Sequence, residues 1–265
     1  SGDHLMGMLD GKKALITGSR RGIGAAIALK LAAEGADIGL NDIERDAEAE
    51  KTMSAVAGLG RMFSWHEADI GNATQREQMF DEFIDAHGRI DILVNNAVLS
   101  RDENFLTVDE EFFDHLMEHG LKGYVFASQR AAKEMIKQGN GGKIISISSV
   151  HSYRAWPNDV VYGMVKAGLN RMALSLALDL SDTGITVNCV APGYIDSRVL
   201  SLDDEPNRGG AGYAEGAMEA IPARRGGLPT DIANAVLFFS SSMADYVNGQ
   251  TLTVDGGFLA GGTPS

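Results

Sequence analysis

The chain has 265 residues and a formal net charge of −13, with 44% hydrophobic residues, 32 glycines and one cysteine. This acidic balance argues against nucleic-acid binding, which favours a basic surface, and against attachment to an anionic membrane. The single cysteine, Cys189, excludes an intramolecular disulfide, and its apolar neighbours favour a buried, unreactive thiol. We expect a soluble cytoplasmic protein, because no apolar run is long enough to cross a bilayer and residues 1–8 lack the core of a signal peptide.

Short apolar runs alternate with stretches of helical periodicity along the chain. The predicted strands cover residues 13–17, 37–41, 61–65, 91–95, 143–148, 186–191 and 251–254. The predicted helices cover residues 22–34, 44–57, 74–87, 109–136, 160–181 and 230–240. This alternation is typical of βαβ units. We expect an α/β fold with a doubly wound, mostly parallel seven-stranded sheet and helices on both faces. One domain over residues 9–265 would follow a flexible end at residues 1–8.

A glycine-rich turn joins the first predicted strand to the first predicted helix. The sequence TGSRRGIG (17–24) supplies Gly18, Gly22 and Gly24. Glycine lets the backbone approach a pyrophosphate closely, and the helix start behind it offers free N–H groups and a positive dipole end. A strand, glycine turn and helix in the first βα unit therefore predict a Rossmann-type dinucleotide site.

The end of the second predicted strand carries a carboxylate that bears on the choice of cofactor. Asp42 stands where a carboxylate can accept hydrogen bonds from both ribose hydroxyls of an adenosine and repel a 2′-phosphate. Arg21 favours the opposite choice, because a guanidinium can pair with that phosphate. We give Asp42 the greater weight and predict NAD as the cofactor, with NADP as the alternative.

Three polar residues in the second half of the chain form a candidate acid–base group. Tyr162 and Lys166 are four residues apart in YGMVK, so they share one face of a helix, and Ser149 ends the fifth strand. A nearby ammonium group stabilises a phenolate, and a serine hydroxyl can hold the substrate oxygen. These groups suit proton transfer while a hydride moves to or from a nicotinamide. Ser148 is the alternative to Ser149, but adjacent strand residues face opposite ways and the spacing to Tyr162 favours Ser149.

Seven short motifs occur in order along the chain. They are TGSRRGIG (17–24), ADI (68–70), NNA (95–97), SS (148–149), YGMVK (162–166), APGYIDS (191–197) and NGQTLTVDGG (248–257). Together they resemble the short-chain dehydrogenase/reductase family over about residues 9–258. The resemblance implies an oxidoreductase in which Tyr162 moves the proton, Ser149 orients the substrate oxygen and Lys166 tunes the tyrosine. It also implies a homotetramer or a homodimer.

The resemblance implies further contacts with the cofactor. Asp69 and Ile70 would contact the adenine, and Asn96 and Ala97 would line the cofactor near its ribose. The residues that would flank the nicotinamide are Pro192, Gly193, Ile195 and Ser197. The other expected cofactor contacts are Gly18, Arg21, Gly22, Ile23, Gly24, Asp42, Tyr162 and Lys166. No metal is expected.

Two positions depart from the family pattern. The family has asparagine where Gly120 stands, at a helix distortion whose main-chain carbonyl helps hold a water of the proton relay. Glycine keeps the carbonyl, so we expect a distorted helix here, with Gly123 as a close-packing point. Val98 replaces a family glycine beside the cofactor. His115 and His119 lie four residues apart without a third metal ligand, so we expect surface histidines or, for His119, a substitute relay group.

The substrate is suggested by the segment SSVHSYRAWP (148–157), which is similar to a segment of bacterial glucose and other sugar dehydrogenases of the family. A sugar, a polyol or another polar hydroxy compound is therefore the expected substrate. His151, Arg154, Trp156 and Arg198 follow strand ends and are its candidate contacts. The arginines are also suited to pairing with the acidic surface.

Residues 197–228 are expected to form a substrate loop or a variable surface loop, because ligands of doubly wound sheets bind at the carboxyl ends of the strands. One alternative function is a reductase of 3-oxoacyl compounds or other ketones, since SRDE at Ser100 is similar to a motif of the 3-oxoacyl reductases. A second is a dinucleotide-binding sensor with weak catalysis, because Gly120 replaces the family asparagine.

Overall fold

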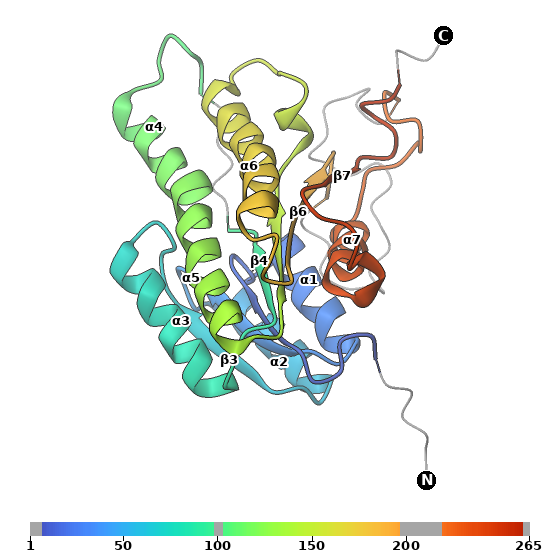
Figure 1. Ribbon diagram of the computed structural model, residues 1–265. Helices are drawn as coiled ribbons and strands as arrows, with labels where there is room; N and C mark the ends of the chain where they lie inside the picture. The colour runs from blue at the N-terminus through green and yellow to red at the C-terminus, as the bar shows by residue number, and fades with distance from the viewer. Residues whose placement is uncertain (1–6, 98–102, 197–218, 262–265) are drawn as a thin grey trace.

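The computed structural model describes residues 7–97, 103–196 and 219–261. Within these residues the centre of the molecule is one sheet of seven parallel strands in the order β3-β2-β1-β4-β5-β6-β7 (Figure 1). The strands are β1 (Lys13–Ile16), β2 (Asp37–Asp42), β3 (Phe63–Glu67), β4 (Ile92–Asn95), β5 (Gly142–Ile147), β6 (Ile185–Pro192) and β7 (Thr251–Val254). The strand order reverses between β1 and β4, so the carboxyl ends of these two strands open the crevice in which such sheets bind ligands.

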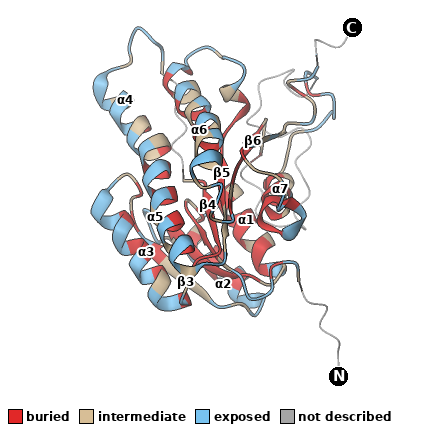
Figure 2. Ribbon diagram, in the orientation of Figure 1, coloured by how far each residue is buried: buried red, intermediate tan, exposed pale blue. Residues whose placement is uncertain are grey.

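Helices cover both faces of this sheet. They are α1 (Gly22–Ala33), α2 (Ala47–Gly58), α3 (Ala73–His87), α4 (Glu110–Met117), α5 (Gly123–Gln138), α6 (Val160–Asp179) and α7 (Pro229–Ser240). The helices α1, α2 and α7 pack on one face, whereas α3, α5 and α6 pack on the other, and buried residues fill the space between the layers (Figure 2). In the described part of the chain no helix is long and apolar enough to cross a membrane.

Alternate residues of the central strands enter two separate hydrophobic cores. In β1, Ala14 and Ile16 join the core formed with α1, α2 and α7, whereas Leu15 joins the core formed with α3, α5 and α6. β4 and β5 follow the same alternation. Because both faces are covered, the central strands β1 and β4 are buried on both sides, which explains their continuous apolar runs in the sequence. The expected doubly wound, Rossmann-type fold is therefore confirmed.

One predicted strand is wrong in position. The run at 61–65 was expected to be a strand, but β3 begins at Phe63 and continues to Glu67. Arg61 precedes the strand and pairs with Asp37, with 3.1 Å between Nη2 and Oδ1, and the backbone N–H of Met62 donates to the same carboxylate oxygen. This ion pair is a contact between segments distant in sequence, which local apolar patterning does not reveal.

Short polar side chains fix where three helices begin. Asp46 accepts two backbone N–H groups of the first turn of α2, each at 3.1 Å, so this helix starts at Ala47 and not near residue 44. Asn72 and Asp109 cap α3 and α4 in the same way, with one N–H each. Such caps contribute about 1 kcal/mol each to helix stability, because they satisfy N–H groups that have no partner within the helix.

The long helix predicted over residues 109–136 is interrupted. A π-helical turn at Glu118–Lys122 separates α4 from α5 and contains Gly120. The helix distortion expected at Gly120 is therefore confirmed. A Cβ atom added to Gly123 would lie 3.1 Å from the carbonyl oxygen of Ile70, so the expected close packing at Gly123 is confirmed as well.

Two histidines are buried together between α3 and the edge strand β3. The hydroxyl of Ser64 lies 2.7 Å from Nε2 of His66 and 2.8 Å from Nε2 of His87. Nδ1 of His66 lies 3.3 Å from Oε2 of Glu82, whereas Nδ1 of His87 has no hydrogen-bond partner among the described residues. Burial is the main cause that lowers the pKa of both imidazoles, and it lowers the pKa of His87 to about 4.

We expect this pair to make the protein sensitive to acid. Because the folded-state pKa of His87 lies below its unfolded value, the unfolded chain binds more protons between about pH 6.5 and about pH 4, and stability falls over that window by about 2 kcal/mol. A His87→Gln variant should lose less stability between these two pH values. Urea unfolding at each pH measures this, with His115→Gln as an exposed control. An equal loss in wild type and His87→Gln would contradict the assignment.

Candidate active site

The glycine turn between β1 and α1 has the geometry of a phosphate cradle. Gly18 has a φ of +63°, and a Cβ added to it would lie 2.5 Å from Cα of Ala97. Arg21 occupies the N-cap position of α1 without a capping side-chain bond, and Gly22 and Gly24 line the cleft in front of it. No side chain of the described residues bonds the first N–H groups of α1, and together with the helix dipole these groups suit a pyrophosphate. These residues fit a dinucleotide.

Asn96 fixes the shape of this turn. Its side-chain amide donates to the carbonyl oxygens of Thr17, at 3.0 Å, and Gly18, at 2.8 Å. The hydroxyl of Thr17 accepts the backbone N–H groups of Asn96 and Ala97 at 3.0 and 3.1 Å. Asn96 was expected beside the cofactor ribose. It does line the cleft, and it also holds the β1 turn against the end of β4.

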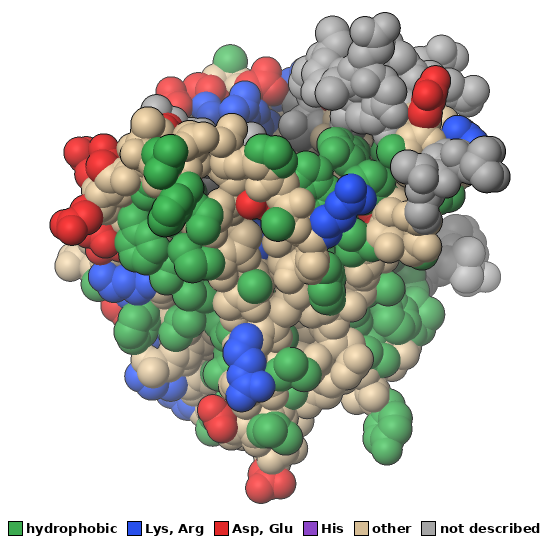
Figure 3. Space-filling model, turned by 90° about the horizontal axis from the view of Figure 1, so that it is seen from above, with side chains coloured by type: hydrophobic (Ala, Val, Ile, Leu, Met, Phe, Trp, Pro, Cys, Tyr) green, Lys and Arg blue, Asp and Glu red, His purple; other side chains and the backbone are tan. Residues whose placement is uncertain are grey.

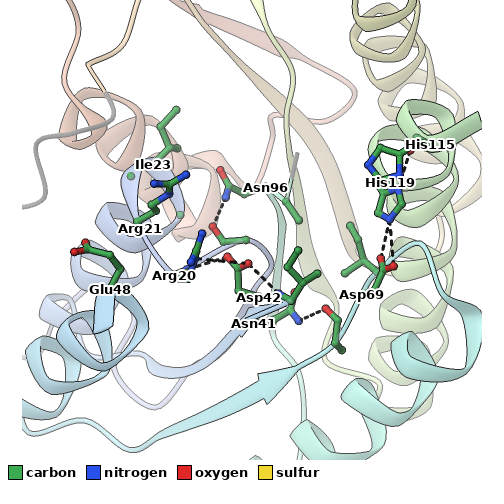
Figure 4. Close-up of a pocket in the computed structure, with 17 residues that line it drawn as sticks. Arg20, Arg21, Ile23, Asn41, Asp42, Glu48, Asp69, Asn96, His115 and His119 are labelled. Carbon is green, nitrogen blue, oxygen red and sulfur yellow. Dashed lines mark hydrogen bonds and ion pairs between the residues drawn. The ribbon is translucent and has the colours of Figure 1, made fainter. Parts of the chain in front are cut away.

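A cleft of about 770 Å³ runs from the glycine turn across the ends of β2, β3 and β4 to α4 (Figure 4). The sequence-predicted residues that line it are Gly18, Arg21, Gly22, Ile23, Gly24, Asp42, Asp69, Ile70, Asn96 and Ala97. The lining residues that were not predicted for the cofactor are Arg20, Asn41, Ile43, Glu48, Ala68, His115 and His119. Position next to a predicted residue was the available signal for Arg20, Asn41, Ile43 and Ala68. Only the tertiary fold brings Glu48 and the two histidines to the cleft.

Carboxylates surround the guanidinium of Arg20 beside Asp42. Nη1 of Arg20 lies 2.5 Å from Asp46 and 3.1 Å from Glu44, and its Nε lies 4.0 Å from Asp42. The backbone N–H of Arg20 also approaches Asp42, at 3.4 Å. The charge of Arg20 is therefore already balanced by acidic neighbours and is not free to meet an added phosphate.

Arg21 and Glu48 lie at the same end of the cleft. The side chain of Arg21 is exposed and makes no ion pair with a described residue, whereas Glu48 reaches the cleft from the first turn of α2 (Figure 4). Near Asp42 the cleft therefore holds more carboxylate than free guanidinium. This charge distribution disfavours an additional phosphate on the ribose.

The far end of the cleft is formed by two histidines. His119 lies with Nε2 3.0 Å from Oδ1 of Asp69, and its Nδ1 lies 2.7 Å from the carbonyl oxygen of His115 (Figure 4). Both ring nitrogens therefore lie against oxygens other than those of Tyr162, and the relay role of His119 stays a prediction. The expectation of two surface histidines is wrong for His119, whose side chain is only 18% exposed.

Tyr124 connects this cleft with the candidate catalytic residues on α6. Its hydroxyl donates to the carbonyl oxygen of Ala97 at 2.9 Å. Burial raises its pKa well above the ordinary value, so Tyr124 remains a protonated donor. Nζ of Lys166 lies 5.8 Å from the centre of the Tyr124 ring and 5.5 Å from that of Tyr162. The structure thus brings Tyr162 and Lys166 together next to the end of β4.

Lys166 is fully buried and has little to balance its charge. Nζ donates to the carbonyl oxygen of Ile147 at 2.8 Å, and burial lowers its pKa to about 7. The hydroxyl of Ser148 donates to the main-chain carbonyl of Lys166 at 3.0 Å. Because this bond occupies the hydroxyl of Ser148, it favours Ser149 as the serine that faces a substrate.

His151 contacts both Ser149 and Tyr162. The hydroxyl oxygen of Ser149 accepts the backbone N–H of His151 at 3.2 Å, and the ring of His151 meets the ring of Tyr162 edge-on with 5.2 Å between centres. Nδ1 of His151 lies 2.9 Å from Oδ2 of the buried Asp159. Asp159 was not predicted, because an aspartate before a helix reads as an ordinary cap in the sequence.

An aromatic cluster extends from His151 toward the C-terminus. Trp156 stacks on His151 with 4.2 Å between ring centres and on Phe258 with 5.8 Å, and Tyr194 meets Phe258 edge-on. The guanidinium of Arg154 lies 5.4 Å from the centre of the Trp156 ring and 5.1 Å from that of Phe258. Arg154 makes no ion pair with a described residue. The predicted residues His151, Arg154 and Trp156 are therefore brought together, whereas Phe258 was missed because it lies about 100 residues away in the sequence.

The predicted nicotinamide-flanking residues follow β6. Pro192 ends this strand, and the N–H of Gly193 donates to Val254 on β7 at 3.0 Å. Ile195 forms an isolated parallel bridge with Gly227. Ser197, Arg198 and most of the expected substrate loop at 197–228 lie outside the described residues, as does Val98.

Comparison with known proteins agrees with this architecture. Residues 18–259 match the family model described as enoyl-(acyl carrier protein) reductase. The chain is 39% identical over 256 residues to 2-dehydro-3-deoxy-D-gluconate 5-dehydrogenase of Escherichia coli (strain K12), covering 95% of this chain and 97% of that protein. It belongs to the short-chain dehydrogenase/reductase family. It is also 37% identical over 247 residues to 3-oxoacyl-(acyl-carrier-protein) reductase FabG of Staphylococcus aureus (strain Mu50), covering 93% and 97% of the two chains.

Solved structures that are similar to this chain include complexes with NADP and with NADH. One from Burkholderia cenocepacia J2315 in complex with NADP is 32% identical, with a TM-score of 0.86 over 95% of this chain and 99% of that one. A 7α-hydroxysteroid dehydrogenase complexed with NADH and 7-oxo glycochenodeoxycholic acid is 36% identical, with a TM-score of 0.84 over 94% of each chain. The chain is thus an oxidoreductase of a family that binds nicotinamide dinucleotides and acts on CH–OH groups.

Val165 occupies the space beside Gly120 in this short-chain dehydrogenase. A Cβ added to Gly120 would lie 2.6 Å from Cγ1 of Val165, which is 1% exposed and packs with Leu116 and Val161. A side chain at position 120 would therefore displace the residue that precedes Lys166. The space beside Gly120 is therefore filled by Val165, so Gly120 is not an empty position.

We expect Gly120 and Val165 to be energetically coupled. Gly120→Ala should lower the free energy of unfolding by about 2 kcal/mol through overpacking, although alanine favours helices, and Val165→Ala should cost a similar amount through a cavity. The double variant should lose clearly less than the sum, because the added methyl group enters the vacated space. Urea unfolding of the four proteins measures the coupling energy. Additive losses would contradict this packing account.

Proposed function

We propose that the protein is an NAD-dependent dehydrogenase that interconverts a secondary alcohol and its carbonyl in a small polar compound, such as a sugar, a polyol or a hydroxy acid. The observation that carries the proposal is the continuity of the cleft, which starts with an acidic end at Asp42 and reaches Ala97. From there Tyr124 links it to Lys166 and Tyr162.

The proposed chemistry divides the work among three side chains. Bound NAD supplies the hydride acceptor. Ser149 holds the substrate oxygen. Tyr162 takes the proton of the substrate hydroxyl group while the hydride leaves the carbon that bears this group, and it returns the proton in the reverse reaction. Lys166, held by the carbonyl of Ile147, stabilises the phenolate of Tyr162 when its ammonium group is charged.

The preference for NAD rests on charge. Asp42 offers a carboxylate to the ribose hydroxyls, and Arg20 is already paired with Asp46 and Glu44. A 2′-phosphate at this place would meet Asp42 without gaining the guanidinium of Arg20. Arg21 is the group that would favour NADP.

A polar substrate is supported by the groups around Tyr162. Nδ1 of His151 faces the carboxylate of Asp159, so Nε2 is the ring nitrogen that can hydrogen-bond a substrate hydroxyl group. The exposed guanidinium of Arg154, which lies over the rings of Trp156 and Phe258, can pair with a carboxylate. The relative named for 2-dehydro-3-deoxy-D-gluconate supports a sugar acid as the first class to test.

A reductase of 3-oxoacyl compounds or other ketones is the second candidate. It is favoured by the likeness to the 3-oxoacyl-(acyl-carrier-protein) reductase over nearly the whole chain. The sensor alternative gains no support, since the relatives named above are all named as enzymes.

Initial rates with a panel of sugars, polyols, sugar acids and 3-oxoacyl thioesters test the proposal. Oxidation of at least one sugar, polyol or hydroxy acid with NAD, at a higher kcat/KM than reduction of any 3-oxoacyl thioester, is the expected result. Turnover of the thioesters alone would favour the second candidate and overturn the first.

The proposal includes a homotetramer or a homodimer. Exposed apolar side chains lie on α5 (Val125, Phe126, Ile136) and on α6 (Met164, Leu174, Leu178). Seen from above, the molecule carries many hydrophobic side chains on its surface and acidic ones toward its rim (Figure 3). Such apolar surface favours self-association. Light scattering on the purified protein tests it, and a monomer at all concentrations would overturn it.

A further inference from the structure

The side chains of His119 and Asp69 contact each other and line the end of the cleft that lies farthest from the glycine turn. Nε2 of His119 lies 3.0 Å from Oδ1 and 3.2 Å from Oδ2 of Asp69 (Figure 4). The side chains are 18% and 34% exposed, so the pair is partly removed from water. His119 stands on the π-helical turn, whereas Asp69 follows β3, so the tertiary fold creates this contact.

Both nitrogens of His119 face oxygens that can only accept hydrogen bonds. Nδ1 lies 2.7 Å from the carbonyl oxygen of His115, and Nε2 faces the carboxylate of Asp69. A ring nitrogen that carries a proton donates to the oxygen that it faces, so the ring is placed to bond its own turn and the carboxylate. His119 is thus anchored to its own helix and holds the side chain of Asp69 in one orientation.

The chain also leaves room for this contact. A Cβ added to Gly71 would lie 2.9 Å from Nε2 of His119 and 3.2 Å from Oδ1 of Asp69. The N–H of Gly71 donates to the same Oδ1 at 2.8 Å, so this oxygen is held from two sides. Among the described residues, Oδ2 makes the longer contact, 3.2 Å, to His119, and it keeps capacity to accept a hydrogen bond from a further donor.

We propose that His119 is a positioning residue that makes the cleft select a 6-aminopurine. It acts by holding the carboxylate of Asp69 so that this side chain accepts a hydrogen bond from the exocyclic amine of adenine. The inference rests on the proposed use of NAD, which carries this base. A 6-oxopurine would present an acceptor to the carboxylate at the same place and would be rejected. Without His119, the side chain of Asp69 can turn toward water, and the discrimination between 6-aminopurines and 6-oxopurines is lost.

Equilibrium binding of AMP, IMP and reduced nicotinamide mononucleotide tests the proposal without turnover. The wild type should bind AMP about tenfold more tightly than IMP, and His119→Leu should reduce this ratio to about twofold. His119→Gln, which keeps a donor, should restore part of the ratio. Gly71→Ala should lower the ratio as His119→Leu does, because the added methyl group displaces the imidazole from Asp69.

Two controls separate base recognition from a general structural effect. Glu118→Gln changes an exposed charge on the same π-helical turn and should leave the AMP to IMP ratio unchanged. The affinity for reduced nicotinamide mononucleotide, which has no purine, should be equal in all variants. An unchanged ratio in His119→Leu, or an equal loss of affinity for the mononucleotide, would overturn the proposal.

The outcome is independent of the reaction catalysed. If no alcohol is oxidised with NAD but the AMP to IMP ratio falls in His119→Leu, the proposed function fails and this inference stands. If NAD-linked oxidation is found and the ratio is unchanged, this inference fails alone.

Discussion

Replacing Tyr162 by phenylalanine is expected to lower kcat by about 10³-fold, the usual contribution of a positioned general acid or base. The ring would remain between His151 and Lys166, so packing is preserved while the ionisable hydroxyl is lost. Steady-state rates with the best substrate of the panel measure the loss, and fluorescence titration with NADH should give an affinity within about twofold of the wild type.

Tyr153→Phe is the matched control for this variant. Tyr153 is 55% exposed and lies outside the group around Lys166, so its loss should leave kcat within about twofold of the wild type. Full activity in Tyr162→Phe would contradict the assignment of the proton donor. A comparable loss in both variants would contradict it as well, because the effect would then not be specific to position 162.

Replacing Lys166 by methionine is expected to stabilise the cofactor-free protein while lowering kcat at least about 100-fold. Lys166 is 1% exposed, and burial lowers its pKa to about 7, so its charge is poorly balanced inside the fold. Methionine has a similar unbranched shape and carries no charge. We expect the free energy of unfolding at about pH 7 to rise by about 2 kcal/mol, because the cost of burying an ammonium group is removed.

The pH dependence gives this prediction a second readout. The folded pKa of Lys166 lies below its unfolded value, so above about pH 7 the unfolded chain binds one more proton and stability rises with pH. Burial raises the pKa of Cys189 to about 12, which has the opposite effect above its ordinary pKa of about 8.5. Between about pH 7 and about pH 8.5 the wild type should therefore gain about 2 kcal/mol, whereas Lys166→Met should show no gain.

Urea unfolding of both proteins at the two pH values measures the difference, and Lys133→Met, on the exposed side of α5, is the control. If the free energy of unfolding changed equally between the two pH values in wild type and Lys166→Met, the view that a buried ammonium group weakens the fold would be contradicted. Lower stability of Lys166→Met at about pH 7 would contradict it too, since the bond to Ile147 would then outweigh the cost of burial.

Much of the fold followed from local patterns. The apolar runs of β1 and β4 were visible in the sequence, because strands buried on both faces are continuously apolar. The glycine turn could be predicted as a phosphate cradle, because a positive φ and close approach restrict those positions to glycine. The start of β3 was misplaced, because the ion pair of Arg61 with Asp37 is invisible to periodicity.

Part of the candidate site could likewise be predicted from the sequence, and part of it could not. Tyr162 and Lys166 could be paired from helical spacing alone. The contact of His119 with Asp69, the filling of the space at Gly120 by Val165 and the packing of Phe258 on Trp156 could not. Each joins segments separated by many residues, so its geometry exists only after the sheet and its helices have assembled.

The ratio of kcat/KM for NAD to that for NADP tests the central claim most directly. With the best substrate of the panel, the wild type should favour NAD by at least about tenfold, because a 2′-phosphate would meet Asp42 while Arg20 is already paired. Asp42→Ser should lower that ratio by about tenfold or more, because the repelling carboxylate is removed. A wild-type preference for NADP, or an unchanged ratio in Asp42→Ser, would contradict the account.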